Sequence, residues 1–218
     1  MASSPLVLCL TNHVASNFTA NCLLAVGAKP AMVEDSSEAA ELAGIADAVL
    51  INLGTVTAAQ AEAMRAAIAC AKRKGTPWVL DPVGVQCLRY RRELAREFLA
   101  QRPTLVRGNR TEIEFIGPID VPSLATGAED VVSSPQSQFP VTISGGTPLL
   151  QLVTATGCAQ GALCAAFLGW GQAPEKAAIS ASKLMKKAGN IAQSRAQAPG
   201  SFQIALLDAI FELADQFR

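Results

Sequence analysis

The chain has 218 residues, half of them hydrophobic, with 18 basic and 18 acidic side chains. Balanced charge gives no basic patch for nucleic acid, and no apolar run reaches the roughly 20 residues needed to cross a bilayer. Met1 opens no charged-then-apolar leader, and the six cysteines form no C-x-x-C pair, so we expect reduced thiols in a cytoplasmic protein that binds neither nucleic acid nor membrane.

Short apolar runs alternate with amphipathic segments over the first half of the chain. The elements expected there, in chain order, are a strand at 6–10, a helix at 17–26, a strand at 30–33, a helix at 37–43 with Ser37 as its cap, a strand at 48–51, a helix at 57–74, a strand at 78–80, a helix at 89–100 and a strand at 104–106.

The second half is less regular. Residues 117–140 are rich in Pro, Ser and Gly and show no firm period, although a short helix near 128–132 is compatible with them. The remaining expected elements are a strand at 141–143, an apolar helix that opens at 153–158 and runs to 168, and helices at 174–195 and 203–217. We see no internal repeat and no linker, so residues 1–218 are expected to form a single domain.

The alternation of strands and helices predicts the α/β class, with a mostly parallel sheet covered by helices on both faces. Ligands of such sheets bind outside the carboxyl ends of the strands. Loops are polar everywhere, but an Asp-Pro and an Asn-x-x-Glu directly after buried runs favour a binding site. The polar residues expected at this edge are Asn12, Gly54, Asp81, Arg107, Asn109 and Glu112.

A turn of small residues at 153–158 opens the apolar helix. Free backbone N–H groups and the helix dipole make such a start an anion site, and phosphate is its usual occupant. Cys158 lies at this positive end, which favours the thiolate form. On these six residues alone, a threonine cap on a buried helix with a buried cysteine is about as good an interpretation.

Several ordered stretches together resemble the hydroxyethylthiazole kinase family of the ribokinase-like superfamily. The stretches that carry the resemblance are residues 5–12, 17–21, 27–32, 50–55, 81–84, 107–112, 147–150, 153–158 and 200–203. The resemblance implies a ribokinase-like three-layer α/β/α sandwich. It also implies ATP-dependent phosphorylation of the hydroxyl group of 4-methyl-5-(2-hydroxyethyl)thiazole in thiamine salvage, and a homotrimer with active sites at subunit interfaces.

The resemblance also assigns roles by position. Cys158 takes the place of the catalytic base, where many relatives carry Asp, and Ser144 replaces the family's usual Thr. The remaining roles are a thiazole pocket of Asn12, Met32, Gly54 and Ala155, ATP contacts from Arg107, Ser144, Asn109 and Gly157, and a Mg²⁺ site at Asp81 and Glu112, partly through water.

The chain departs from the family pattern in four places. Ala155 stands where Gly is usual, the segment 117–140 is short, and residues 85–87 replace small glycine-rich residues. A pair of strands expected between Gly145 and Gly146 is absent. Three of these changes, all but the one at 85–87, bear on ATP binding.

Two other functions stay open on these residues. A non-catalytic thiazole-binding or assembly relative would explain the trimmed ATP side. A cysteine hydrolase would use Cys158 as nucleophile, but His13 is the single histidine that could serve as its base. A dinucleotide-dependent oxidoreductase is disfavoured, because no G-x-G-x-x-G follows the first strand.

Overall fold

A single eight-stranded sheet forms the centre of the computed structural model, which describes residues 4–218. The strand order is β2-β1-β3-β4-β5-β6-β7-β8; the first six strands in this order are parallel, and β7 runs antiparallel to both of its neighbours, β6 and β8. The strands are β1 Leu6–Leu10, β2 Lys29–Met32, β3 Ala48–Asn52, β4 Trp78–Asp81, β5 Leu105–Asn109, β6 Ser123–Thr126, β7 Asp130–Ser133 and β8 Val141–Ile143.

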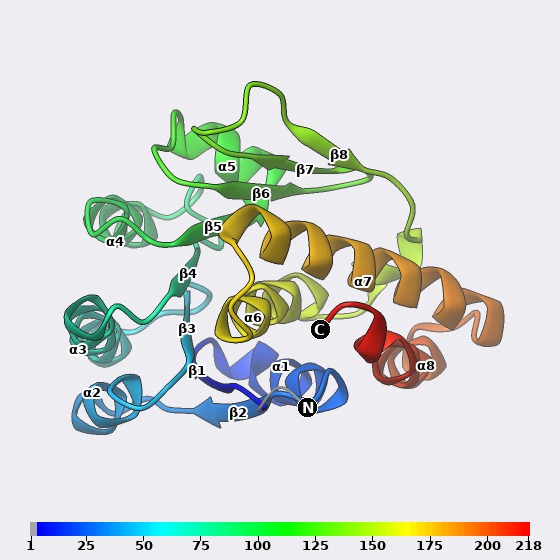
Figure 1. Ribbon diagram of the computed structural model, residues 1–218, viewed down its shortest axis with the longest axis horizontal. Coiled ribbons are helices and arrows are strands. Elements are labelled where there is room, and N and C mark those ends of the chain that lie inside the picture. Colours follow the sequence, from blue (N-terminus) through cyan, green and yellow to red (C-terminus); the bar gives the residue numbers. More distant parts are fainter. Residues whose placement is uncertain (1–3) are drawn as a thin grey trace.

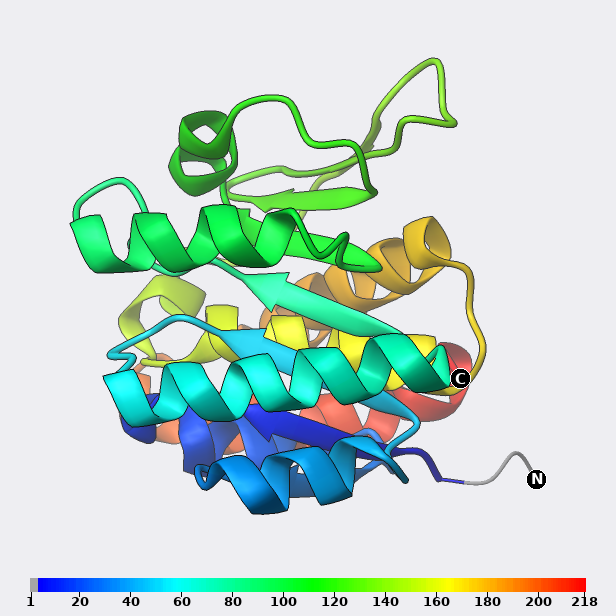
Figure 2. The same cartoon turned by 90° about the vertical axis from the view of Figure 1, so that its left-hand side faces the viewer.

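Helices cover both faces of the sheet. In Figure 1, α2, α3 and α4 lie on one side and α1, α6, α7 and α8 on the other, and Figure 2 shows the first group running across the sheet. The helices are α1 His13–Ala25, α2 Ser36–Ala43, α3 Ala58–Lys74, α4 Arg89–Leu99, α5 Arg110–Ile116, α6 Thr156–Gly169, α7 Pro174–Arg195 and α8 Pro199–Leu213, with 3-10 turns η1 Pro148–Leu152 and η2 Ala214–Gln216. This confirms the expected three-layer α/β/α arrangement.

Successive side chains along a strand point to opposite faces of the sheet and contribute to two separate hydrophobic clusters. In β3, Val49 and Ile51 pack toward α2 and α3, whereas Leu50 packs toward α6. All five residues of β3 are buried, as expected for a parallel strand covered on both faces. Helix α6 lies between α1 and α7 against the middle of the sheet, and its alanines and glycines let it approach the strands closely.

Three helix boundaries differ from the expected ones because residues suited to a helix start outweigh the apolar pattern. Helix α1 begins at His13 rather than at residue 17, since the Asn12 side chain accepts a hydrogen bond from Ala15 N. Asp35, and not Ser37, caps α2. Helix α8 begins at Pro199, a residue suited to a first helical position.

The segment 117–140 holds the main correction. The short helix expected near residues 128–132 is wrong: Asp130–Ser133 forms β7, where Val131 and Val132 suit a strand better than a helix. The hairpin of β7 and β8 also shows that a strand pair is present, just before Ser144, rather than missing. A further strand, β6, has no clear signal in the sequence.

In the part of the chain described here, no helix is both long and apolar enough to cross a membrane. The expectation that no leader starts at Met1 concerns residues outside the described range.

Candidate active site

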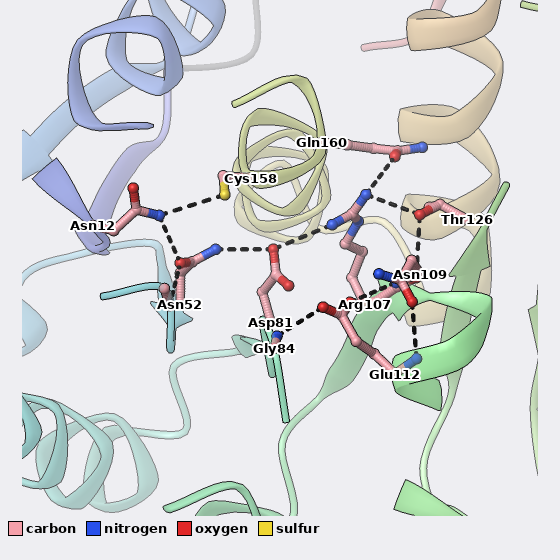
Figure 3. Close-up of polar contacts among 12 residues, drawn as sticks. Asn12, Asn52, Asp81, Gly84, Arg107, Asn109, Glu112, Thr126, Cys158 and Gln160 are labelled. Carbon is pink, nitrogen blue, oxygen red and sulfur yellow. Dashed lines mark hydrogen bonds and ion pairs between the residues drawn. The ribbon is translucent and has the colours of Figure 1, made fainter. Parts of the chain in front are cut away.

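Polar side chains from neighbouring strands meet at the carboxyl edge of the sheet (Figure 3). Asn52 and Asp81 are the last residues of β3 and β4 and are register partners. Asn52 Nδ2 donates to Asp81 Oδ2 at 3.0 Å, and Asn12 Nδ2 donates to Asn52 Oδ1 at 3.1 Å. The expected gathering of Asn12, Gly54, Asp81 and Arg107 is therefore present, and Asn52, which is not among the predicted site residues, lies in its middle.

Backbone amides fix the orientation of both asparagine side chains. Asn12 Oδ1 accepts from Ala15 N at 2.9 Å, and Asn52 Oδ1 accepts from Gly54 N at 3.0 Å. The Asn12 NH₂ group must then face the other way, where it lies 3.6 Å from the sulfur of Cys158. Gly54 is required here because a β-carbon on it would lie 2.5 Å from Asn12 Nδ2.

Cys158 occupies the first turn of α6, as expected, but its electrostatics are the reverse of our expectation. Burial raises the pKa of the thiol, the nearby Asp81 carboxylate raises it further, and Arg107, Asn52 and Asn12 only partly oppose this. The position at the start of α6 therefore does not lower the pKa of this thiol, because burial and the Asp81 carboxylate both disfavour the charged form. The group at this position is a thiol whose sulfur accepts a hydrogen bond from Asn12.

Asp81 is completely buried at the end of β4. Burial raises the pKa of its carboxyl to about 7, and the charge of Glu112 adds to this while Arg107 and Asn52 lower it. Its Oδ2 is 3.4 Å from Arg107 NH1, whereas Oδ1 has no hydrogen-bond partner. A buried, unpartnered carboxylate oxygen is unusual, and it leaves Asp81 Oδ1 available to a ligand.

Glu112 links two loops at the same edge. Its Oε1 accepts from Gly84 N and its Oε2 from Asn109 N, both at 2.8 Å, while Asn109 Oδ1 accepts from Glu112 N at 2.8 Å. This is a capping box at the start of α5. Glu112 therefore positions the loops after β4 and β5, and it keeps only its remaining lone pairs for a ligand.

The acidic residues suit a divalent cation that is held by few protein ligands better than one that is enclosed by protein ligands on all sides. Among residues 4–218 no group of three or more His, Cys, Asp or Glu side chains is arranged to hold a metal ion. Mg²⁺ keeps most of its water and is held through one or two carboxylates together with substrate phosphates. The free Oδ1 of Asp81, with Glu112 nearby, meets that requirement.

Arg107 forms the boundary between the polar edge and an open cavity. Its NH2 donates to Thr126 Oγ1 at 2.9 Å and to Gln160 Oε1 at 3.3 Å. A cavity of about 290 Å³ lies beside it, bordered among others by Arg107, Asn109, Thr126, Gly157, Gln160 and Lys186. A second cavity of about 270 Å³ adjoins it and shares Gly127, Leu150, Gln151 and Lys186.

Ser144 does not lie beside Arg107, where its expected contact with ATP would place it. Ser144 is exposed, donates to Glu129 Oε1 at 2.7 Å and borders neither of these two cavities. Thr126, at the end of β6, is the hydroxyl beside Arg107. The residues before Thr126 carry no firm strand signal, which is why sequence reasoning misses it.

Ala155 is the cap residue of α6 and has a φ of +75°. This left-handed conformation explains why a glycine is usual there. Met32 ends β2 and is half-buried. Neither of the two cavities includes Asn12, Met32, Gly54 or Ala155, so the expected thiazole residues lie outside the cavities beside Arg107.

Comparison with known proteins decides the family. The sequence model of the hydroxyethylthiazole kinase family matches residues 1–122 and 118–216. The chain belongs to the hydroxyethylthiazole kinase family. The hydroxyethylthiazole kinases of Corynebacterium efficiens and Escherichia coli strain SMS-3-5 are 42% and 43% identical to it; the alignments cover 97% and 99% of this chain and 89% and 92% of those proteins.

Solved structures agree with this assignment. The hydroxyethylthiazole kinase protein of Pyrococcus horikoshii OT3 superposes with a TM-score of 0.91 at 34% identity, over 95% of this chain and 88% of that chain. Pyridoxal kinase from Staphylococcus aureus, solved with AMP-PCP and pyridoxal, gives a TM-score of 0.65 at 16% identity, over 85% of this chain and 88% of that one. That second likeness shows the ribokinase-like fold alone.

The family match consists of two segments rather than one. Its two segments meet at residues 118–122, which connect α5 to β6. Because the β7–β8 hairpin is present, we correct the expectation of a missing strand pair before Gly146: the break between the two matched segments falls instead in the α5–β6 connection.

Proposed function

We propose that this protein transfers the γ-phosphoryl group of ATP to the hydroxyl group of 4-methyl-5-(2-hydroxyethyl)thiazole, in the cytoplasm and as a step of thiamine salvage. The observation that carries the proposal is family membership over nearly the whole chain, at 42–43% identity to hydroxyethylthiazole kinases. Phosphoryl transfer relies mainly on positioning and on neutralising negative charge, and the residues of this edge are of the kinds that do both.

Two groups are assigned to the phosphates. The first N–H groups of α6 have no side-chain cap, so they are free to bind an anion. Arg107 lies close beside them, since a β-carbon on Gly157 would be 2.9 Å from Arg107 NH2. Thr126 and Asn109 border the same cavity and are assigned to the nucleotide. Ser144 is not, because it lies outside both cavities.

Asp81 and Glu112 are the residues that would hold Mg²⁺, mostly through water. Bound there, the ion supplies positive charge for the phosphates. The roles of Asn12 and Cys158 are carried by the protein alone: Asn12 donates to the sulfur, so the S–H hydrogen is left to face an incoming hydroxyl group. Cys158 then orients the alcohol as a thiol, and the proton of the alcohol passes to an oxygen of the transferred phosphoryl group as the new O–P bond forms and the bond to ADP breaks.

A trimer would complete the thiazole side. Large hydrophobic side chains are exposed on α8 and on the two elements that pack against it, α1 and η1. They are Val14, Leu24, Leu152, Ile204 and Phe211, each 58% exposed or more. We assign this surface to subunit contacts, and light scattering of the purified protein should give the mass of three chains.

The test is an ADP-release assay with the thiazole alcohol, Mg²⁺ and ATP. We expect turnover by the native chain and a loss of about a hundredfold in kcat for Cys158→Ala, with the KM for ATP nearly unchanged. Cys164→Ala is the matched control, because Cys164 is fully buried in the same helix and lines neither cavity. An undiminished rate in Cys158→Ala would remove Cys158 from the mechanism.

A second measurement, calorimetry, decides between the kinase and the non-catalytic relative. Calorimetry that shows thiazole binding without Mg-ATP binding would establish the non-catalytic relative instead. A hydrolase has little support, because His13 is exposed and pairs with Glu34 at 3.0 Å rather than with Cys158.

A further inference from the structure

The ammonium group of Lys186 lies inside a shell of oxygen atoms. Its Nζ is 3.0 Å from the carbonyl oxygen of Ala128, 3.2 Å from that of Gly145 and 3.3 Å from that of Gly127. Asp130 Oδ1 is also 3.3 Å away, and both side chains are at most 7% exposed. An ammonium group has three N–H donors, so four surrounding oxygens cannot each accept a separate hydrogen bond. The oxygens surround the ammonium group as they would surround a spherical cation.

We propose that this shell is a monovalent-cation site and that Lys186 Nζ is its built-in occupant. Carbonyl and carboxylate oxygens without nitrogen or sulfur are the ligands of hard cations. One carboxylate in the shell balances one positive charge. A potassium ion and an ammonium group have the same charge and similar size, so a shell that fits one accepts the other.

The shell ties separate segments to α7. Gly127 and Ala128 belong to the turn between β6 and β7, and Gly145 belongs to the loop between β8 and η1. Figure 1 shows α7 passing beside β7 and β8, with which it is in contact. Gly146 lies against the stem of Lys186, since a β-carbon there would be 3.3 Å from Lys186 Cγ. Lys186 therefore lines both cavities while its ammonium group joins the segments around them.

The shell is also connected to the candidate active site. Asp130 Oδ2 accepts from Gln160 Nε2 at 3.0 Å and from Ser182 Oγ at 2.7 Å. Gln160 in turn accepts from Arg107 NH2. Loss of the ammonium would leave the Asp130 carboxylate buried without a cation, and it would disturb Arg107 through Gln160.

The proposal makes the native protein indifferent to monovalent salts and makes a variant without the ammonium dependent on them. The first measurement is thermal melting, without nucleotide, in potassium, ammonium, sodium and tetramethylammonium chloride at equal ionic strength. We expect equal Tm values for the native chain. We expect Lys186→Ala to melt lower, and potassium or ammonium to raise its Tm by about 3 °C or more over tetramethylammonium.

The second measurement is the ADP-release rate, which rests on the proposed function, whereas melting does not. Lys186→Ala should lose at least about tenfold in kcat/KM for ATP and should recover in potassium or ammonium. Lys186→Met, which keeps the stem and leaves the ammonium position open, should behave likewise. Lys183→Ala, an exposed neighbour on α7, should respond equally to all four salts.

Three results would overturn the proposal. One is a Lys186→Ala protein that melts alike in potassium and tetramethylammonium, and another is a native chain that potassium stabilises or activates severalfold. The third concerns a variant that does not fold, which is then refolded in each of the four salts. Recovery in potassium or ammonium alone supports the site, and failure in all four salts overturns the proposal.

Discussion

Replacing Asp81 with asparagine is expected to stabilise the protein above neutral pH while it removes kinase activity. Burial raises the pKa of the Asp81 carboxyl from 3.8 to about 7, with a further rise from Glu112. Between these pH values the folded chain binds more protons at Asp81 than the unfolded chain does. Stability therefore falls as the pH rises from about 4 to about 7.

The size of the effect follows from the difference between the two pKa values. From 3.8 to about 7 is about three units, which corresponds to about 4 kcal/mol and is reached in full only above the folded pKa. Asparagine carries no charge and its oxygen still accepts from Asn52 and Arg107. Asp81→Asn should therefore recover up to this amount at alkaline pH and almost nothing near pH 4.

Urea unfolding of both proteins at about pH 5 and about pH 8 measures the difference. Asp208→Asn, an exposed change on α8, is the control and should give no pH-dependent gain. The ADP-release assay should show Asp81→Asn to be nearly inactive. A stability gain of equal size at both pH values, or a variant less stable than the native chain at the higher pH, would refute the reasoning.

Gln160→Leu should release Arg107 and raise the KM for ATP about tenfold in steady-state kinetics, with thiazole binding unchanged by calorimetry; an unchanged KM would contradict the holding role of Gln160. Ala155→Gly should stabilise the protein by about 1 kcal/mol in urea unfolding, because it relieves the left-handed conformation, and a less stable variant would count against that strain. Thr126→Val should weaken Mg-ATP binding about tenfold while Ser144→Ala should not; calorimetry giving the opposite order would return Ser144 to the nucleotide site.

Much of the fold can be predicted because its signals are local. Buried parallel strands such as β3 and β4 read as short apolar runs, and the polar residue that ends each one marks the carboxyl edge. Parallel register then brings those residues together without further information. The amino-acid pattern alone is therefore enough to predict that Asn12, Asp81 and Arg107 share one site.

The remaining features depend on contacts between distant segments. The pKa of Cys158 is set by its burial and by Asp81, 77 positions away in the sequence, and a six-residue motif carries neither. Gln160 looks like a lone polar residue on an apolar helix until Asp130 and Arg107 supply its partners. Thr126 lies in a segment without any period, so its strand cannot be separated from loop by pattern.

The side-chain amides of Asn12 and Asn52 are held in one orientation, so a small chemical change such as deamidation would be among the most damaging at this edge. Deamidation of Asn52 exchanges one NH₂ group for oxygen, and that oxygen would face the Asp81 carboxylate that the amide now donates to. At Asn12 the same exchange would set an oxygen against the lone pairs of Cys158 and of Asn52. Deamidation during storage hardly alters the shape of a side chain, but it would replace hydrogen-bond donors with acceptors along the contacts from Cys158 through Asn12 and Asn52 to Asp81.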